Sequence, residues 1–146
     1  MKTIGRKIKA LHDRLTRLKQ LSEELNTFQD YENSSNYKDI AERGIQVSIE
    51  ICLDIAKIVI SRKNLPEPKD NKGVFVVLAE AGIISEESLK FLVPMAGTRN
   101  ILVHGYDKVD DSLIYGILKR HLADFEKYLV EVVEISAPQE NKFEGF

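Results

Sequence analysis

The sequence predicts an all-α protein, an antiparallel up-and-down bundle of about five helices. Apolar residues recur every three or four positions over long stretches, which is the helical period. The one short β-branched run, at residues 73–78, has no second run with which it could pair. A chain of 146 residues can bury a core without disulfides or metals, so we expect one domain over residues 1–135 and a frayed tail over 136–146.

The first helix is predicted from an unbroken apolar pattern. Its apolar positions are Ile8, Leu11, Leu15, Leu18, Leu21, Leu25 and Phe28, all spaced three or four residues apart. This spacing predicts one long amphipathic helix over residues 8–28. The polar segment 33–36 then interrupts the pattern, and Asn36 followed by Asp39 predicts the start of the next helix.

The second helix, predicted over residues 37–62, should be the central one. Ile40, Val47, Ile51, Ile55 and Ile58 form one apolar side, and Ile45, Ile49, Cys52 and Val59 form another. Its remaining stripe is polar at a spacing of four: Glu42, Gln46, Glu50 and Asp54. This narrow face could meet solvent or hold a buried cation. The prolines at 66 and 68 end the helix.

Residues 73–78 are ambiguous, because a short β-branched run is compatible with a buried strand or a helix. We predict a helix closed by Gly82, since no partner strand is present. The next helix should begin at Ser85-Glu86-Glu87, and Pro94 should kink or restart it, which would leave a short segment over 94–103. Asp110-Asp111-Ser112 predicts the start of the last helix.

Composition indicates a cytoplasmic protein. The single cysteine, Cys52, allows no internal disulfide and fits a reducing compartment. The chain opens with polar residues in place of a signal peptide, and no apolar stretch approaches the roughly 18 residues of a membrane-spanning helix. We therefore expect no membrane association.

Basic residues are concentrated at the start of the chain, although the net charge is only −2. Residues 1–20 hold seven basic side chains and one acid, Asp13. A basic face on the first helix could guide a polyanion to the protein. The alternative is an ordinary solvated helix face.

The residues best suited to chemistry lie in the segment Arg99-Asn100-Ile101-Leu102-Val103-His104-Gly105-Tyr106. Arginine is a permanent cation whose planar fork matches phosphate oxygens, and histidine exchanges a proton near neutrality. Together they suit phosphodiester cleavage without a metal. The other histidines, His12 and His121, and Cys52 lack metal-ligand spacing, so we predict neither a metal site nor a cofactor.

Helix geometry constrains how these groups meet. Arg99 falls on the apolar side of its helix and needs a partner, for which Glu42, Glu50 or Asp54 of the central helix, or a substrate phosphate, are the candidates. His104 lies about 140° around an ideal helix from Arg99 and about 7.5 Å along it. A positive φ at Gly105 would end the helix and let His104 and Tyr106 turn back toward Arg99.

The motif resembles the Arg-x4-His-x-Tyr signature of the HepT-like branch of HEPN proteins, carried here by Arg99, His104 and Tyr106. Ala41-Glu42-Arg43-Gly44-Ile45-Gln46 and the acidic helix start at Asp110-Asp111 are also similar to that branch, and the resemblance covers roughly residues 5–133.

This resemblance implies the toxin of a type VII HEPN/MNT toxin–antitoxin system, a metal-independent endoribonuclease that acts as a homodimer. Arg99 and His104 would be catalytic, and Asn100 would orient Arg99 or a phosphate. A nucleotidyltransferase antitoxin would attach AMP to Tyr106 and so block the pocket. One motif histidine per chain leaves one proton transfer unassigned, and a two-fold dimer would supply a second His104.

Two other functions fit the same residues. The dimer could hold a nucleotide or dock the transferase without cutting RNA. Alternatively the bundle could be purely structural, with Arg99 paired to a carboxylate and His104 capping its helix.

Overall fold

A computed structural model describes residues 2–105 and 108–144 of the chain, with side chains described up to residue 135. All regular elements in these ranges are helical, which confirms the predicted all-α class. The elements are α1 (Lys2–Glu24), α2 (Phe28–Glu32), α3 (Ser35–Arg62), α4 (Asn71–Glu80), α5 (Glu86–His104), α6 (Asp111–Gly116), the π-helical turn η2 (Ile117–His121) and α7 (Leu122–Glu144).

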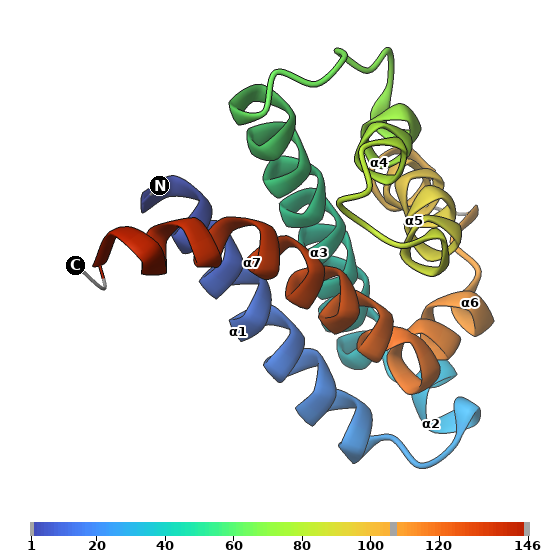
Figure 1. Cartoon of the computed structure of the whole chain (residues 1–146). Helices are drawn as coiled ribbons and strands as arrows, with labels where there is room; N and C mark the ends of the chain where they lie inside the picture. Colours follow the sequence, from blue (N-terminus) through green and yellow to red (C-terminus); the bar gives the residue numbers. More distant parts are fainter. Residues whose placement is uncertain (1, 106–107, 145–146) are drawn as a thin grey trace.

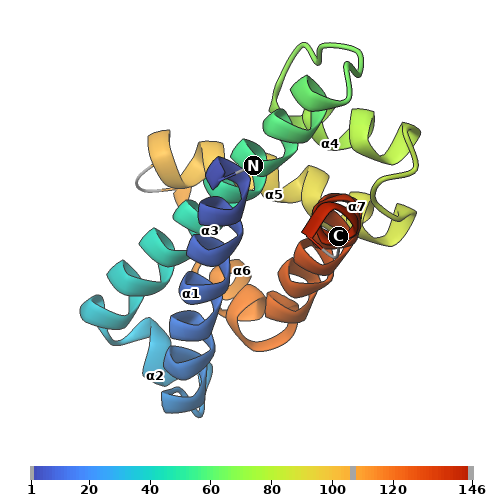
Figure 2. The same ribbon diagram turned by 60° about the vertical axis from the view of Figure 1, so that its left-hand side comes forward.

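The helix α3 is central, as predicted, and lies between α1 and α5 (Figure 1). The helices α1 and α3 run side by side in both views (Figure 2) and are antiparallel, since Lys7 pairs with Asp54 at one end and Leu18 contacts Gly44 toward the other. A Cβ on Gly44 would lie 2.6 Å from Leu18 Cδ2, so glycine permits this close approach.

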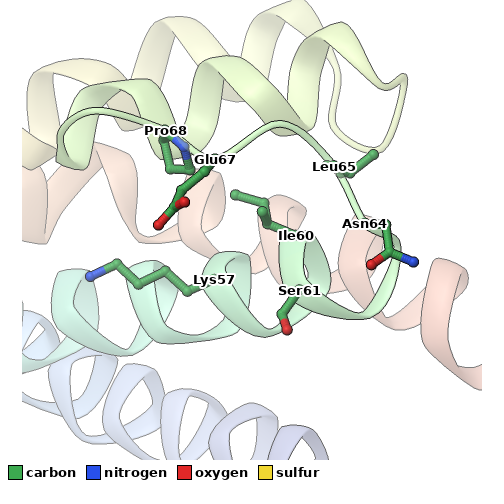
Figure 3. Close-up of a pocket in the computed structure, with 7 residues that line it drawn as sticks. All are labelled: Lys57, Ile60, Ser61, Asn64, Leu65, Glu67 and Pro68. Carbon is green, nitrogen blue, oxygen red and sulfur yellow. The ribbon is translucent and has the colours of Figure 1, made fainter.

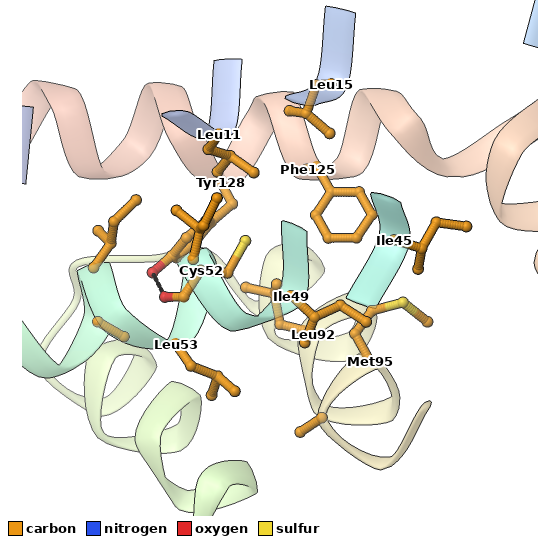
Figure 4. Packing of buried hydrophobic residues seen from close by; sticks show 14 of the residues in the cluster. Leu11, Leu15, Ile45, Ile49, Cys52, Leu53, Leu92, Met95, Phe125 and Tyr128 are labelled. Carbon is orange, nitrogen blue, oxygen red and sulfur yellow. Dashed lines mark hydrogen bonds between the residues drawn. The ribbon is translucent and has the colours of Figure 1, made fainter. Parts of the chain in front are cut away.

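The core is formed where α1, α3, α5 and α7 meet. Leu11 and Leu15 of α1, Ile45 and Ile49 of α3, Leu92 and Met95 of α5, and Phe125 and Tyr128 of α7 pack together there (Figure 4). The Tyr128 hydroxyl donates a hydrogen bond of 2.8 Å to the Cys52 carbonyl, which satisfies a polar group within this apolar region.

The predicted first helix is divided in two. The helix α1 ends at Glu24, and Thr27 caps the short helix α2 by accepting a hydrogen bond of 3.1 Å from the backbone N–H of Asp30. The apolar spacing continues to Phe28 because that ring still packs inward, at 5.5 Å from the Tyr115 ring. Periodicity alone therefore missed a break that a capping threonine produces.

The start of α3 and one of its faces also differ from the prediction. Ser34, and not Asn36, caps the helix by accepting a hydrogen bond of 3.2 Å from the backbone N–H of Tyr37. Ile40, assigned to an apolar side of the helix, is 56% exposed, so that side is not buried along its whole length.

Residues 73–78 are helical, as predicted. Asp70 caps α4, and Gly82, with φ of 74°, follows its C-terminal end. The backbone N–H of Ile83 donates to the Leu78 carbonyl at 2.9 Å, which completes a Schellman motif.

Of the two predicted effects of Pro94, the restart of the helix is wrong, because α5 runs without a break from Glu86 to His104, and the kink stays a prediction. Pro94 lies on an exposed side of α5, so the carbonyl of Lys90 that loses its helical donor can be solvated by water. The motif residues Arg99 and His104 therefore share one continuous helix.

The last helix begins where the sequence predicts, with Asp110 as its N-cap. The helix continues through α6, η2 and α7 to Glu144, and the boundary of a frayed tail at residue 136 stays a prediction. Within the described residues, no helix is long and apolar enough to cross a membrane.

Candidate functional site

The Arg99 guanidinium is held by one carboxylate of α3. Its Nε and Nη2 atoms both donate to Glu50 Oε2, at 3.1 and 3.0 Å, and Gln46 Nε2 approaches the same oxygen at 3.5 Å. The side chains of Arg99 and Glu50 are 27% and 33% exposed. Of the three candidate partners, Glu50 is therefore the one that binds Arg99, and it orients the guanidinium while leaving it within reach of solvent.

The other two candidate carboxylates have different neighbours. Asp54 Oδ2 forms an ion pair of 2.9 Å with Lys7 Nζ of α1. Glu42 lies near Asp111 and Asp39, and its partial burial, reinforced by these two negative charges, raises the pKa of its carboxyl group. Neither carboxylate forms a hydrogen bond with Arg99 in the described part of the chain.

Arg99 borders a surface hollow of about 280 Å³, which is also lined by Glu50, Leu53, Asp54, Lys57 and Asn71. Lys57 is exposed and was not among the predicted site residues, although its position seven residues after Glu50 places it on the same face of α3. Its place beside Arg99 depends on how α3, α4 and α5 pack, which the sequence pattern does not reveal.

Two further hollows adjoin this one. The hollow at Arg99 shares Asn71 with a second hollow of about 420 Å³, which is also lined by Asp70, Lys72, Ala96 and Asn100. Lys57 is shared with a hollow of about 530 Å³ at the C-terminal end of α3, beneath the segment with Glu67 and Pro68 (Figure 3). The last of these contains no motif residue.

Asn100 is exposed and lies next to the guanidinium. Its Oδ1 atom accepts a hydrogen bond of 3.4 Å from Arg99 Nη1. Nη1 is the terminal nitrogen of Arg99 that does not donate to Glu50. Its contact with Asn100 Oδ1 is long for a hydrogen bond, so Nη1 is available to an anion.

His104 is the last residue of α5 and is exposed. Gly105 does not turn the chain back, because its φ is −98° and not positive. A Cβ on Gly105 would lie 2.8 Å from the Ile101 carbonyl oxygen, so glycine is needed for close backbone approach. His104 therefore stays on the helix, about 140° around it from Arg99, and the predicted turn of His104 back toward Arg99 at a positive φ of Gly105 is wrong.

Tyr106, the predicted AMP acceptor, lies outside the described residues. Pro94, Gly97 and Ile101 precede His104 at helical spacing and share its outward side of α5. Ile101 is 42% exposed, so this side presents an apolar residue one turn before the histidine.

The described residues contain no group of three histidine, cysteine or acidic side chains placed to hold a metal ion. Burial raises the pKa of the Cys52 thiol, so this residue is an unreactive core side chain. The ring of His121 binds Asp124 at 2.8 Å and stacks on Phe91, which gives it a structural role.

The fold and the motif define a class: a small all-α protein with a carboxylate-held arginine and an exposed histidine on one helix. The family model for Ribonuclease HepT-like proteins matches residues 11–132. The chain belongs to this family, as its motif indicates.

Two relatives support this assignment. The mRNA nuclease HepT of Shewanella oneidensis is 31% identical over 85 residues, which are 58% of this chain and 64% of that protein. The tRNA nuclease HepT of Aphanizomenon flos-aquae is 27% identical over 103 residues, which are 70% of each chain. The matched regions thus span about two thirds of these relatives' length.

Solved structures show the same fold. A tri-AMPylated Shewanella oneidensis HEPN toxin in complex with an MNT antitoxin superposes with a TM-score of 0.80 and 25% identity, over 90% of this chain and 96% of that one. The cytosolic protein YutE of Bacillus subtilis has a TM-score of 0.80 at 16% identity, over 94% of this chain and 91% of that one. The second likeness is one of fold alone.

Proposed function

We propose that this protein is the toxin of a HEPN/MNT toxin–antitoxin pair in the cytoplasm and cleaves RNA as a metal-independent endoribonuclease. The observation that carries the proposal is the position and hydrogen bonding of the Arg99 guanidinium. This family-motif arginine is oriented by Glu50 at the edge of a hollow, with Nη1 available to a phosphate. The relatives named as RNA nucleases support the same chemistry.

Cleavage requires a base, an acid and a cation. The base removes the proton of the ribose 2′-hydroxyl, the 2′-oxygen forms a bond to phosphorus, and the bond from phosphorus to the 5′-oxygen breaks as an acid protonates that oxygen. Arg99 stabilises the additional negative charge on the phosphorane. His104 performs one of the two proton transfers.

The second proton transfer requires a homodimer in this proposal. Within one chain, His104 projects about 140° around α5 from Arg99, and the motif contains a single histidine. The side of α5 with Ile101 and His104 faces outward, so a two-fold axis beside it would bring the two histidines together, and the second His104 could perform the other proton transfer.

Tyr106 is the proposed regulatory residue. The antitoxin nucleotidyltransferase would transfer AMP to its hydroxyl, which adds bulk and negative charge seven residues after Arg99 in the motif. The adenylyl phosphate would then compete with the substrate phosphate for the arginine. The Tyr106→Phe variant would escape this neutralisation while it keeps Arg99 and His104.

The direct test is RNA cleavage by the purified protein in EDTA. We expect the wild type to cleave, and His104→Ala and Arg99→Ala to lose at least about 100-fold in rate. His12→Ala, which removes an exposed histidine of α1, is the matched control and should cleave as the wild type does. Undiminished cleavage by both motif variants, or loss of wild-type cleavage in EDTA, would refute the proposal.

A further inference from the structure

Three arginines from two helices, none of them part of the motif, gather on one side of the molecule. Arg14 and Arg17 are three residues apart on α1, so they project from the same face. The contact of Leu18 with Gly44 brings this part of α1 against the part of α3 that carries Arg43. We call Arg14, Arg17 and Arg43 the arginine cluster.

The cluster has positive charge that the described residues do not neutralise. No carboxylate in the described ranges forms an ion pair with any of its guanidinium groups. Asp13, whose carboxylate is close enough to Arg17 for their charges to interact, already binds Lys9 at 3.0 Å. Partial burial lowers the pKa of Arg14, and repulsion by Arg17 and Arg43 adds to this effect, in agreement with the helical positions of the three arginines.

The cluster also has a fixed relation to the candidate site. Arg43 and Glu50 are seven residues apart on α3, so their side chains leave the helix within about 20° of each other and about 10.5 Å apart along its axis. Glu50 holds Arg99. The helices α1 and α5 flank α3 (Figure 1). Since Arg43 and Glu50 leave α3 on one side, we expect the cluster and Arg99 to border the same polar face of α3.

We propose that the arginine cluster binds the phosphate backbone of the RNA substrate, at phosphates away from the one that is cleaved. Arginine forks make paired hydrogen bonds to phosphate and remain charged at every physiological pH. Backbone contacts of this kind position a strand without reading its sequence. The inference rests on the proposed function, because it assigns a second contact surface to the same substrate.

The test measures binding of a fluorescent 2′-O-methyl RNA, which cannot be cleaved, as a function of salt concentration. Each phosphate contact with a single strand contributes about 0.7 to the slope of log affinity against log salt. The variant Arg14→Gln, Arg17→Gln, Arg43→Gln should therefore reduce that slope by about 2 and bind at least about 10-fold more weakly at low salt.

A second triple variant controls for total charge. Lys63→Gln, Lys69→Gln, Lys90→Gln removes three exposed cations from other parts of the surface and should leave the slope almost unchanged. The cluster variant should unfold at a temperature no lower than that of the wild type, because repulsion is relieved. An equal loss of binding in both variants would refute the inference.

Cleavage assays separate this inference from the proposed function. A dinucleoside monophosphate has a single phosphate and cannot occupy both surfaces, so the cluster variant should cleave it at the wild-type rate and long RNA more slowly. Cleavage by the wild type with an unchanged salt slope in the cluster variant would overturn only this inference. Absence of both RNA binding and cleavage in the wild type would overturn both proposals. Loss of antitoxin binding with RNA binding intact would make the cluster a protein-docking surface and refute the inference.

Discussion

Gly105 follows the motif histidine at a point where the backbone leaves no room for a side chain. Its N–H donates to the Ile101 carbonyl at 2.7 Å, and a Cβ would lie 2.8 Å from that oxygen. The obstacle is a backbone atom, which cannot move aside as the end of a flexible side chain can. Gly105 therefore maintains the helix end that presents His104.

We predict that Gly105→Ala lowers the free energy of unfolding by about 1–3 kcal/mol, the usual cost of overpacking. Gly5→Ala is the matched control, since Gly5 is helical and nothing lies within 4 Å of an added Cβ. That change should be neutral or stabilising by up to about 1 kcal/mol. Urea unfolding followed by circular dichroism measures both, and equal effects would contradict the prediction.

At the scale of elements, α3 connects Arg99 of the candidate site with α1 and with the arginine cluster. Its Glu50 forms an ion pair with Arg99 of α5, and its Asp54 forms one with Lys7 of α1. Its Arg43 belongs to the arginine cluster. Its N-terminal end is held by the Ser34 hydroxyl, which accepts from the N–H of Tyr37 at 3.2 Å. A weaker cap would fray the first turn of α3, about two turns before Arg43.

We predict that Ser34→Ala destabilises the protein by about 1 kcal/mol, the typical loss of an N-cap. Ser35→Ala changes the adjacent exposed serine, which is inside the helix, and should have little effect or stabilise slightly. Urea unfolding midpoints of the two variants provide the comparison. The prediction is wrong if Ser35→Ala is the more damaging change.

At the scale of the whole molecule, the proposed reaction needs two copies of the chain. One copy places Arg99 in a hollow between α3 and α5 and directs His104 outward from the end of α5. Among the described residues, Ile40, Ile101, Leu113 and Val130 are the large apolar side chains that are exposed. Only Ile101 shares a helix face with His104.

We predict that light scattering gives twice the mass of one chain, and that Ile101→Asp converts the dimer to a monomer that no longer cleaves RNA. A charge at the centre of an apolar contact cannot be solvated there, so the dimer should dissociate. Val130→Asp is the matched control, since Val130 is 57% exposed on α7. A wild-type monomer that cleaves RNA at full rate would refute the dimer requirement.

Several local features were predictable because neighbouring residues determine them. The caps at Ser85 and Asp110 and the turn at Gly82 follow from residue type and spacing, and the structure has all three. The break at Thr27 was not predicted, because the same apolar spacing fits either a continuous or a divided helix. The continuity of α5 through Pro94 was not predicted either, because a proline can stay inside a helix where the freed carbonyl faces solvent, and packing decides which side that is.

The amino-acid sequence by itself determined the helical class, the inward face of most helices, the family motif and the set of carboxylates available to Arg99. Only the tertiary structure selected Glu50 from that set, kept His104 on a continuous helix and assembled the arginine cluster. The physical reason is that periodicity specifies which side of a helix is buried. The register between two helices depends on contacts between distant residues, such as Leu18 with Gly44, which no local pattern encodes.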